Sequence, residues 1–214
     1  MRHINKFNQI LNNILRVPTT IKNRNALKNH EFSIITNNCL GGKLLHELNM
    51  RFNSPFINLS ISDSDYINML KSFSEYMKSP LICVRDFGPN SECRYPIGKI
   101  NGPNGEVKLK FIHYKSFDEA SKKWEERKKR INYNNLFVVM TCTGKISESL
   151  INEFENLSFD SKIMFLNHKT SYKCCKYIKG FENKDGLGFL WDYSSFGQKY
   201  YDQFAFVNWF NSKR

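Results

Sequence analysis

Short apolar runs rich in β-branched residues recur along the chain, and helix-periodic or polar stretches separate them. Such runs, bounded by turn residues, are typical of buried strands. We assign strands to residues 32–36, 54–60, 80–84, 135–140, 162–166 and 173–178. Helices are predicted over residues 43–50, 66–78, 117–131, 147–157 and 197–210. Because strands and helices alternate, the pattern favours a mainly parallel, Rossmann-like sheet in a three-layer α/β/α fold.

One segment of the pattern differs from this alternation. Residues 95–100 and 107–113 are two strand-like runs on either side of Asn101-Gly-Pro-Asn-Gly105. Turn residues between two such runs predict a β-hairpin. We therefore expect a hairpin inserted into the α/β domain.

The N-terminal 30 residues carry six basic residues and no acidic one. A helical apolar stripe, which we expect to end at Pro18, consists of Ile4, Phe7, Leu11, Ile14 and Leu15. This segment is either a basic amphipathic arm on a membrane or a helix packed on the domain. The narrow apolar face without Trp favours the packed helix. We divide the chain into a basic helical arm, residues 1–30, and a single α/β catalytic domain, residues 31–214.

Net charge and cysteine usage limit the partners and the cellular location that we expect. The 214 residues carry a net charge of +12, which indicates an anionic partner, although solubility alone is an alternative explanation. No nucleic-acid-binding module is recognisable, so nucleic acid is not the expected partner. The six cysteines form no C-x-x-C pair, and there is no signal peptide or long apolar run. We expect a cytoplasmic protein with free thiols and no metal site.

The stretch Thr36-Asn-Asn-Cys-Leu-Gly-Gly42 joins a predicted strand to a predicted helix, a place where α/β proteins bind ligands. Cys39 in this turn is either a nucleophile or a buried structural thiol. Asn37 or Asn38 could donate hydrogen bonds to an oxyanion, and Gly41 and Gly42 would let a ligand approach the backbone. The alternative is that these amides and glycines only serve the turn.

Two further residues could complete a catalytic set. His113 ends a predicted strand and could remove a proton from a hydroxyl or a thiol, or it could simply bond a carbonyl. Asp202, near the C-terminus, could orient an imidazole. In the basic helix, Lys123, Arg127 and Arg130 could bind phosphates, or they could form a solvated helix face.

Taken in order, several segments resemble a bacterial family of exopolysaccharide or capsule biosynthesis proteins. The matching pieces are Phe32–Gly42, Ser54-Pro-Phe-Ile-Asn58, Tyr95-Pro-Ile-Gly-Lys99, Phe111-Ile-His-Tyr114, Glu119-Ala with Trp124, Arg127 and Arg130-Ile-Asn132, and Lys199–Trp209. The chain departs from the family at Leu40, where an aromatic is usual, and at Ala205, where an acid is usual. The resemblance implies a three-layer α/β fold and a role in surface-polysaccharide assembly.

These observations together favour an O-acetyltransferase that uses acetyl-CoA and acts on an anionic capsule or exopolysaccharide. Either Cys39 carries the acetyl group after deprotonation by His113, or His113 activates the sugar hydroxyl directly and Cys39 lines the pocket. One alternative is a glycosyl- or phosphosugar transferase. Another is a non-catalytic assembly factor at the membrane or in a capsule complex.

Overall fold

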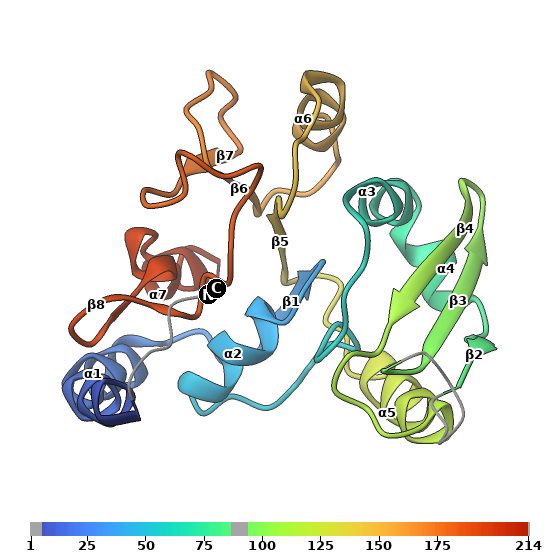
Figure 1. Cartoon of the computed structure of the whole chain (residues 1–214). Coiled ribbons are helices and arrows are strands. Elements are labelled where there is room, and N and C mark those ends of the chain that lie inside the picture. Colours follow the sequence, from blue (N-terminus) through green and yellow to red (C-terminus); the bar gives the residue numbers. More distant parts are fainter. Residues whose placement is uncertain (1–5, 87–93, 214) are drawn as a thin grey trace.

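A four-stranded parallel sheet with the strand order β1-β5-β6-β7 forms the centre of the protein (Figure 1). The computed structural model describes residues 6–86 and 94–213. The strands are β1 (Ser33–Thr36), β5 (Leu136–Thr141), β6 (Lys162–Leu166) and β7 (Cys175–Tyr177). The mixed α/β architecture with a mainly parallel sheet confirms the predicted fold class.

Both faces of this sheet are buried. Successive side chains along each strand belong alternately to two apolar clusters, one on each face. In β5, Val138 and Met140 face one cluster, and Phe137 and Val139 face the other. The first cluster is covered by α3 (Asp63–Lys71), α4 (Phe73–Lys78), α5 (Phe117–Lys128) and α6 (Glu148–Glu155). The second is covered by α2 (Leu40–Glu47) and α7 (Phe206–Phe210). The sheet therefore lies between two helical layers.

A second, antiparallel sheet lies on the side of α3 and α5 (Figure 1). It consists of β2 (Ile82–Arg85), β3 (Ile97–Gly102) and β4 (Gly105–Lys110). The predicted hairpin is confirmed: β3 and β4 pair around a turn that closes at Gly105, whose φ of +102° suits glycine. The run at 80–84 does form a strand, but β2 pairs with β3 and not with the parallel sheet.

The run at 54–60 does not form the predicted strand. Only Ser60 makes an isolated bridge, to Lys110, and Asn58 adopts a φ of +61° that a strand cannot accommodate. The apolar residues Phe56, Ile57 and Leu59 are nonetheless fully buried. The hydrophobic pattern thus reported burial here and not strand pairing.

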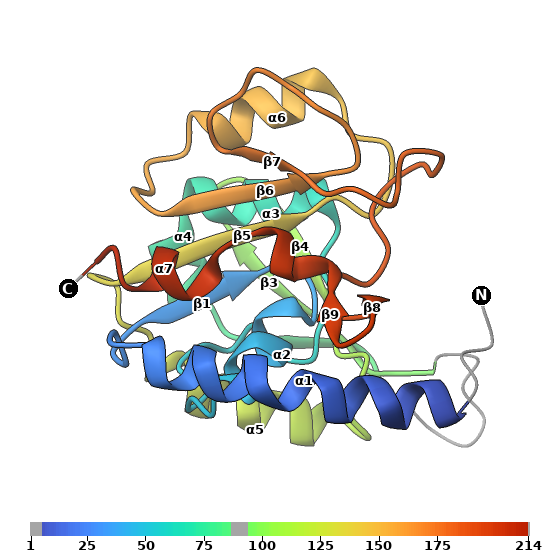
Figure 2. The same ribbon diagram turned by 90° about the vertical axis from the view of Figure 1, so that its left-hand side faces the viewer.

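Helix bounds also differ from the predictions. The helix expected over 66–78 breaks at Ser72 into α3 and α4. The chain end, predicted as one helix over 197–210, instead contains β9 (Gln198–Lys199), a 3-10 helix, η1 (Tyr200–Gln203), and α7. Strand β9 pairs with the preceding β8 (Tyr193–Ser195) as a hairpin. Helix α1 (Lys6–Ala26) continues through Pro18, contrary to the expectation that it ends there. Figure 2 shows α1 running along the edge of the molecule beneath β1 and α2.

Candidate functional site

Asn37 joins the carboxyl ends of β1 and β5. Its side-chain amide donates hydrogen bonds to Thr141 O and to Asp63 Oδ1, each at 3.0 Å, and accepts one from Thr141 N at 3.0 Å. Asn37 is only 2% exposed. Both of its N–H donors have partners inside the protein, so in this structure neither is free for the oxyanion that the sequence suggested.

Asp63 lies in the first turn of α3, after the N-cap Ser62, and is half-buried beside the ends of β1 and β5. Burial raises the pKa of Asp63 to about 6, although the hydrogen bond from Asn37 acts in the opposite direction. The Asp63 charge also adds to burial in raising the pKa of Cys142, which follows β5, so the two groups lie close together. A carboxyl group that titrates near neutral pH at a strand end is a candidate acid or base.

Thr141 adds an unusual feature to the same strand end. Its hydroxyl is buried and has no hydrogen-bond partner in the part of the chain that the structure describes. A buried unpaired hydroxyl costs about 1–3 kcal/mol.

Cys39 occupies the N-cap position of α2 and is 1% exposed. Its thiol points to Leu59 O, with the sulfur 3.9 Å from the oxygen. Burial raises the pKa of Cys39 to about 11, and the nearby charge of Lys43 only partly offsets this effect. At pH 7 only about one molecule in 10⁴ would carry the thiolate, so the geometry favours the structural interpretation of this thiol.

The other residues of the turn also serve its packing. Asn38 Oδ1 accepts from Leu40 N at 3.0 Å, which closes a local turn. A Cβ added to Gly41 would lie 2.9 Å from Thr36, and one added to Gly42 would lie 3.2 Å from Ile57. The two glycines therefore let α2 pack closely on β1 and on the segment after it, and in this structure they are buried against protein atoms and not against a ligand site.

Tyr114 connects this turn to the basic helix α5. Its hydroxyl donates to Ile57 O at 3.0 Å and accepts from Arg127 Nη1 at 2.7 Å. Burial raises the pKa of Tyr114, and the charge of a Cys39 thiolate would raise it further, so the phenol lies near the thiol. The Arg127 guanidinium also lies over the Phe52 ring, 5.2 Å from its centroid. The structure thus brings Arg127 to the side of the Cys39 turn.

The two other predicted phosphate-binding residues are held differently. Arg130 Nη1 donates to Phe52 O at 3.5 Å, which places it beside Arg127. Lys123 pairs with Glu126 one turn along α5, with 3.6 Å between the charged atoms. Arg127 and Arg130 share a surface as expected, whereas the Lys123 charge is partly neutralised by its own helix.

His113 does not join the Cys39 turn in the way the sequence suggested. It lies in a turn after β4, at the end of an antiparallel strand, and its side chain is exposed. Within residues 6–86 and 94–213, no hydrogen bond joins His113 to Cys39 or to Asp202. The histidine of the predicted catalytic set is therefore not oriented by the predicted acid.

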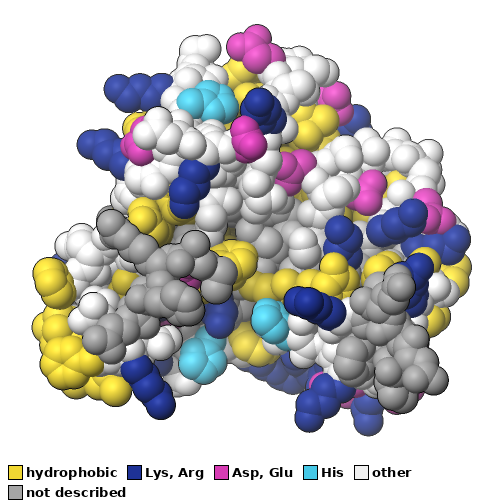
Figure 3. All heavy atoms as spheres, viewed as in Figure 1, with side chains coloured by type: hydrophobic (Ala, Val, Ile, Leu, Met, Phe, Trp, Pro, Cys, Tyr) yellow, Lys and Arg dark blue, Asp and Glu magenta, His cyan; other side chains and the backbone are white. Residues whose placement is uncertain are grey.

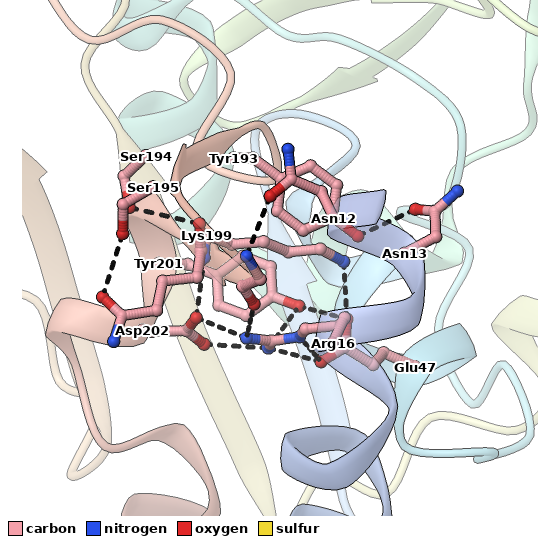
Figure 4. Close-up of polar contacts among 12 residues, drawn as sticks. Asn12, Asn13, Arg16, Glu47, Tyr193, Ser194, Ser195, Lys199, Tyr201 and Asp202 are labelled. Atoms are coloured by element: carbon pink, nitrogen blue, oxygen red, sulfur yellow. Dashed lines mark hydrogen bonds and ion pairs between the residues drawn. The ribbon is translucent and has the colours of Figure 1, made fainter. Parts of the chain in front are cut away.

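Asp202 belongs instead to a buried ionic cluster that holds α1 to the domain (Figure 4). Arg16, which is 4% exposed, donates to both Asp202 oxygens and to Glu47. Lys199 Nζ and Tyr201 OH also donate to Glu47, at 2.5 and 2.6 Å. In this structure the partner of the Asp202 carboxylate is the guanidinium of Arg16, 186 residues away in the sequence, and not an imidazole.

A cavity of about 440 Å³ adjoins this Arg16 cluster, between α1, α2 and η1. Lys22 also lines the cavity, and the two cations of the cluster, Arg16 and Lys199, face two carboxylates, Glu47 and Asp202. Because the charges pair within the cluster, it is better suited to fixing α1 than to binding a charged ligand. Asp63, whose partner is a neutral amide, is the better candidate for proton transfer.

Two features of the site, the buried Asp63 carboxyl and the Arg16 cluster, were not predicted from the sequence. Asp63 lies in the first turn of α3, three residues before the start of the helix predicted over 66–78, and the burial of its carboxyl beside β5 depends on the sheet order. The Arg16 cluster joins both ends of the chain and has no local signature.

By its fold and site, this is an α/β protein whose polar groups gather where parallel strands end. The chain belongs to the family described as "Domain of unknown function (DUF1919)", whose model matches residues 10–211. It is 38% identical over 188 residues to a Haemophilus influenzae protein named "Uncharacterized protein", covering 86% of each chain.

Among the residues that the structure describes, no helix is long and apolar enough to cross a membrane. Among the same residues, no group of three or more His, Cys, Asp or Glu side chains is placed to hold a metal ion.

Proposed function

We propose that this protein is an acyltransferase that moves an acetyl group from acetyl-CoA to a hydroxyl of a capsule or exopolysaccharide. The observation that supports this most is the half-buried Asp63 carboxyl, with a pKa of about 6, held by Asn37 where β1 and β5 end. General-base catalysis on a hydroxyl is most efficient when the base has a pKa near the working pH. The resemblance to exopolysaccharide biosynthesis proteins supports the acceptor class.

The direct route fits this arrangement better than a covalent one. The sugar hydroxyl oxygen attacks the thioester carbon while Asp63 accepts its proton. The carbon–sulfur bond then breaks, and the coenzyme A thiolate leaves with the proton that Asp63 returns. Cys39 takes no part in bond making, because its buried thiol has a pKa of about 11. No step of this route needs a metal.

On this proposal the basic surface around Arg127 and Arg130 binds the substrates. Arg127 reaches the Cys39 turn through Tyr114, and Arg130 contacts the same Phe52 as Arg127. Guanidinium groups of this kind bind phosphate oxygens by paired hydrogen bonds, so this surface would take the phosphates of coenzyme A. A net charge of +12 would also attract an anionic polymer. On this proposal the enzyme acts in the cytoplasm, where acetyl-CoA is made.

The proposal is tested with radiolabelled acetyl-CoA and surface polysaccharide from the producing organism, stripped of its acetyl esters by mild alkali. We expect label in the polymer with the native protein and at least about a hundredfold less with Asp63→Asn, since general-base catalysis contributes about that much. Asp65→Asn, the same change two residues along α3, is the matched control and should retain transfer within a few-fold.

Three outcomes would count against the proposal. Absence of transfer by the folded native protein would overturn the acetyltransferase. Transfer from a nucleotide sugar in place of acetyl-CoA would show a glycosyl- or phosphosugar transferase. Full transfer by Asp63→Asn, with loss in His113→Ala, would return the role of base to His113.

A further inference from the structure

Helix α1 packs on the domain with its polar face inward, which is the reverse of the usual arrangement. Asn12 Oδ1 accepts from Gly197 N at 2.9 Å, Asn13 Oδ1 accepts from Tyr193 OH at 2.8 Å, and Arg16 is buried in the ionic cluster (Figure 4). These contacts fix the rotation of the helix about its axis. An amphipathic helix ordinarily buries its apolar stripe.

The opposite face of α1 presents apolar side chains to solvent. Ile10, Ile14, Val17 and Ile21 recur at intervals of four, three and four residues, so they form one stripe. They are 55%, 61%, 51% and 52% exposed. Figure 3 shows hydrophobic side chains gathered on the side of the molecule that α1 forms.

The stripe extends onto a second element. Phe196, in the turn between β8 and β9, is 77% exposed. Its neighbour Gly197 lies so close to α1 that an added Cβ would be 2.9 Å from the backbone of Leu15, which is itself 44% exposed. Leu15 and Phe196 therefore adjoin the stripe, and a hydrophobic surface of this extent on one side of a protein marks an interaction site.

Charge indicates what this surface contacts. Helix α1 contains four basic residues and no acidic one. Lys22 and Arg24 are exposed and, at one and three positions beyond Ile21, lie on either side of the stripe, and Arg24 Nε also donates to Glu47 O at 2.7 Å. An apolar stripe flanked by cations is typical of helices that lie in the surface of an anionic bilayer.

A second copy of the chain fits this face less well. Two α1 helices packed through their stripes would bring their flanking cations together with no acid in either helix to pair them. In a chain of net charge +12, this repulsion opposes self-association. The bilayer is therefore the occupant that the charges favour.

We infer that the outer face of α1, with Leu15 and Phe196, docks this protein on the surface of an anionic lipid bilayer. The ionic cluster around Arg16 holds the helix so that its stripe faces the membrane, and Lys22 contacts the lipid phosphates. This site is independent of the proposed acetyl transfer, which takes place at the ends of β1 and β5.

The test is cosedimentation of the full chain with vesicles of equal parts phosphatidylglycerol and phosphatidylcholine, at near-physiological ionic strength. We expect the chain to bind these vesicles. Binding to vesicles of pure phosphatidylcholine should be at least about tenfold weaker, because the attraction to anionic lipid is lost. Ile14→Gln/Ile21→Gln should weaken binding about a hundredfold, since each lost apolar contact costs about tenfold. Neither substitution changes the net charge.

The matched control is Ile82→Gln/Val84→Gln on strand β2, where the two residues are 39% and 47% exposed. Figure 1 shows β2 on the other side of the molecule from α1, so this variant should bind vesicles as the native protein does. Far-ultraviolet circular dichroism confirms that each variant is folded. Equal binding by the two double variants would overturn the inference, because charge alone would then explain adhesion. Absence of vesicle binding, with or without a dimer that Ile14→Gln/Ile21→Gln dissociates, would overturn it as well.

Discussion

Replacing Asp63 by Asn should stabilise the protein at neutral pH although it removes the proposed base. In the folded protein burial raises the pKa of Asp63 to about 6. In the unfolded chain an aspartate has a pKa of about 3.9. The folded state therefore binds the Asp63 proton more tightly, and the native protein loses stability as pH rises from about 4 through 6. The substituted amide would carry no charge at any of these pH values, and its oxygen would still accept the hydrogen bond from Asn37.

The magnitude follows from the two pKa values. Their difference corresponds to about 3 kcal/mol of unfolding free energy at pH 7. Solvent reaches the half-buried carboxyl and reduces this figure. The N-terminus of α3 also favours the carboxylate by about 0.3–1 kcal/mol, which the amide would lose. We expect Asp63→Asn to be more stable than the native protein by about 1–2 kcal/mol at pH 7.5 and equally stable at pH 4.

Urea denaturation of both proteins at several pH values between 4 and 7.5 measures this difference. Other carboxyl groups titrate in the same range, but they are common to both proteins and cancel in the comparison. The stability difference should grow with pH and level off above about 6.5. A difference that does not change with pH, or an Asp63→Asn variant that is less stable at pH 7.5, would refute the assignment of a raised pKa to Asp63.

Three further predictions concern the Arg16 cluster, the reactivity of Cys39 and the packing of Gly186. Arg16→Met should lower the free energy of unfolding by about 3 kcal/mol, because it leaves buried carboxylates without their cation. Arg24→Met removes one exposed hydrogen bond, to Glu47 O, and should cost about 1 kcal/mol or less. Equal effects of the two substitutions in urea denaturation would contradict the role of the cluster. The exposed Cys83 should react with iodoacetamide at least about tenfold faster than the buried Cys39, as followed by peptide mass spectrometry, and equal rates would revive Cys39 as a nucleophile. Gly186→Ala should destabilise the protein by about 3 kcal/mol, since the added Cβ would lie 2.4 Å from a backbone nitrogen of the loop after β5; an unchanged melting temperature would contradict that packing.

The sequence predicted the core strands well, because a continuous apolar run matches a strand buried on both faces. Strand β6 spans the predicted residues 162–166. The same logic failed over 54–60, where apolar side chains are buried by a segment without strand hydrogen bonds. The hydrophobic pattern reports which residues are buried, and it leaves open which backbone groups pair.

The site was harder to predict, because its contacts are tertiary. The turn around Cys39 was located correctly, but the burial that raises the pKa of this thiol depends on Leu59 and the segment around it. Asp202 pairs with Arg16 across 186 residues of sequence. The inward polar face of α1 could not be predicted either, since the amphipathic rule places the apolar face inward.

The most direct test of the proposed chemistry is the pH profile of acetyl transfer to the de-acetylated polymer, measured with saturating acetyl-CoA. We predict a rate that rises with an apparent pKa near 6 in the native protein and in Cys39→Ser, and that falls at least about a hundredfold in Asp63→Asn. A rate that is lost in Cys39→Ser and retained in Asp63→Asn would contradict the account.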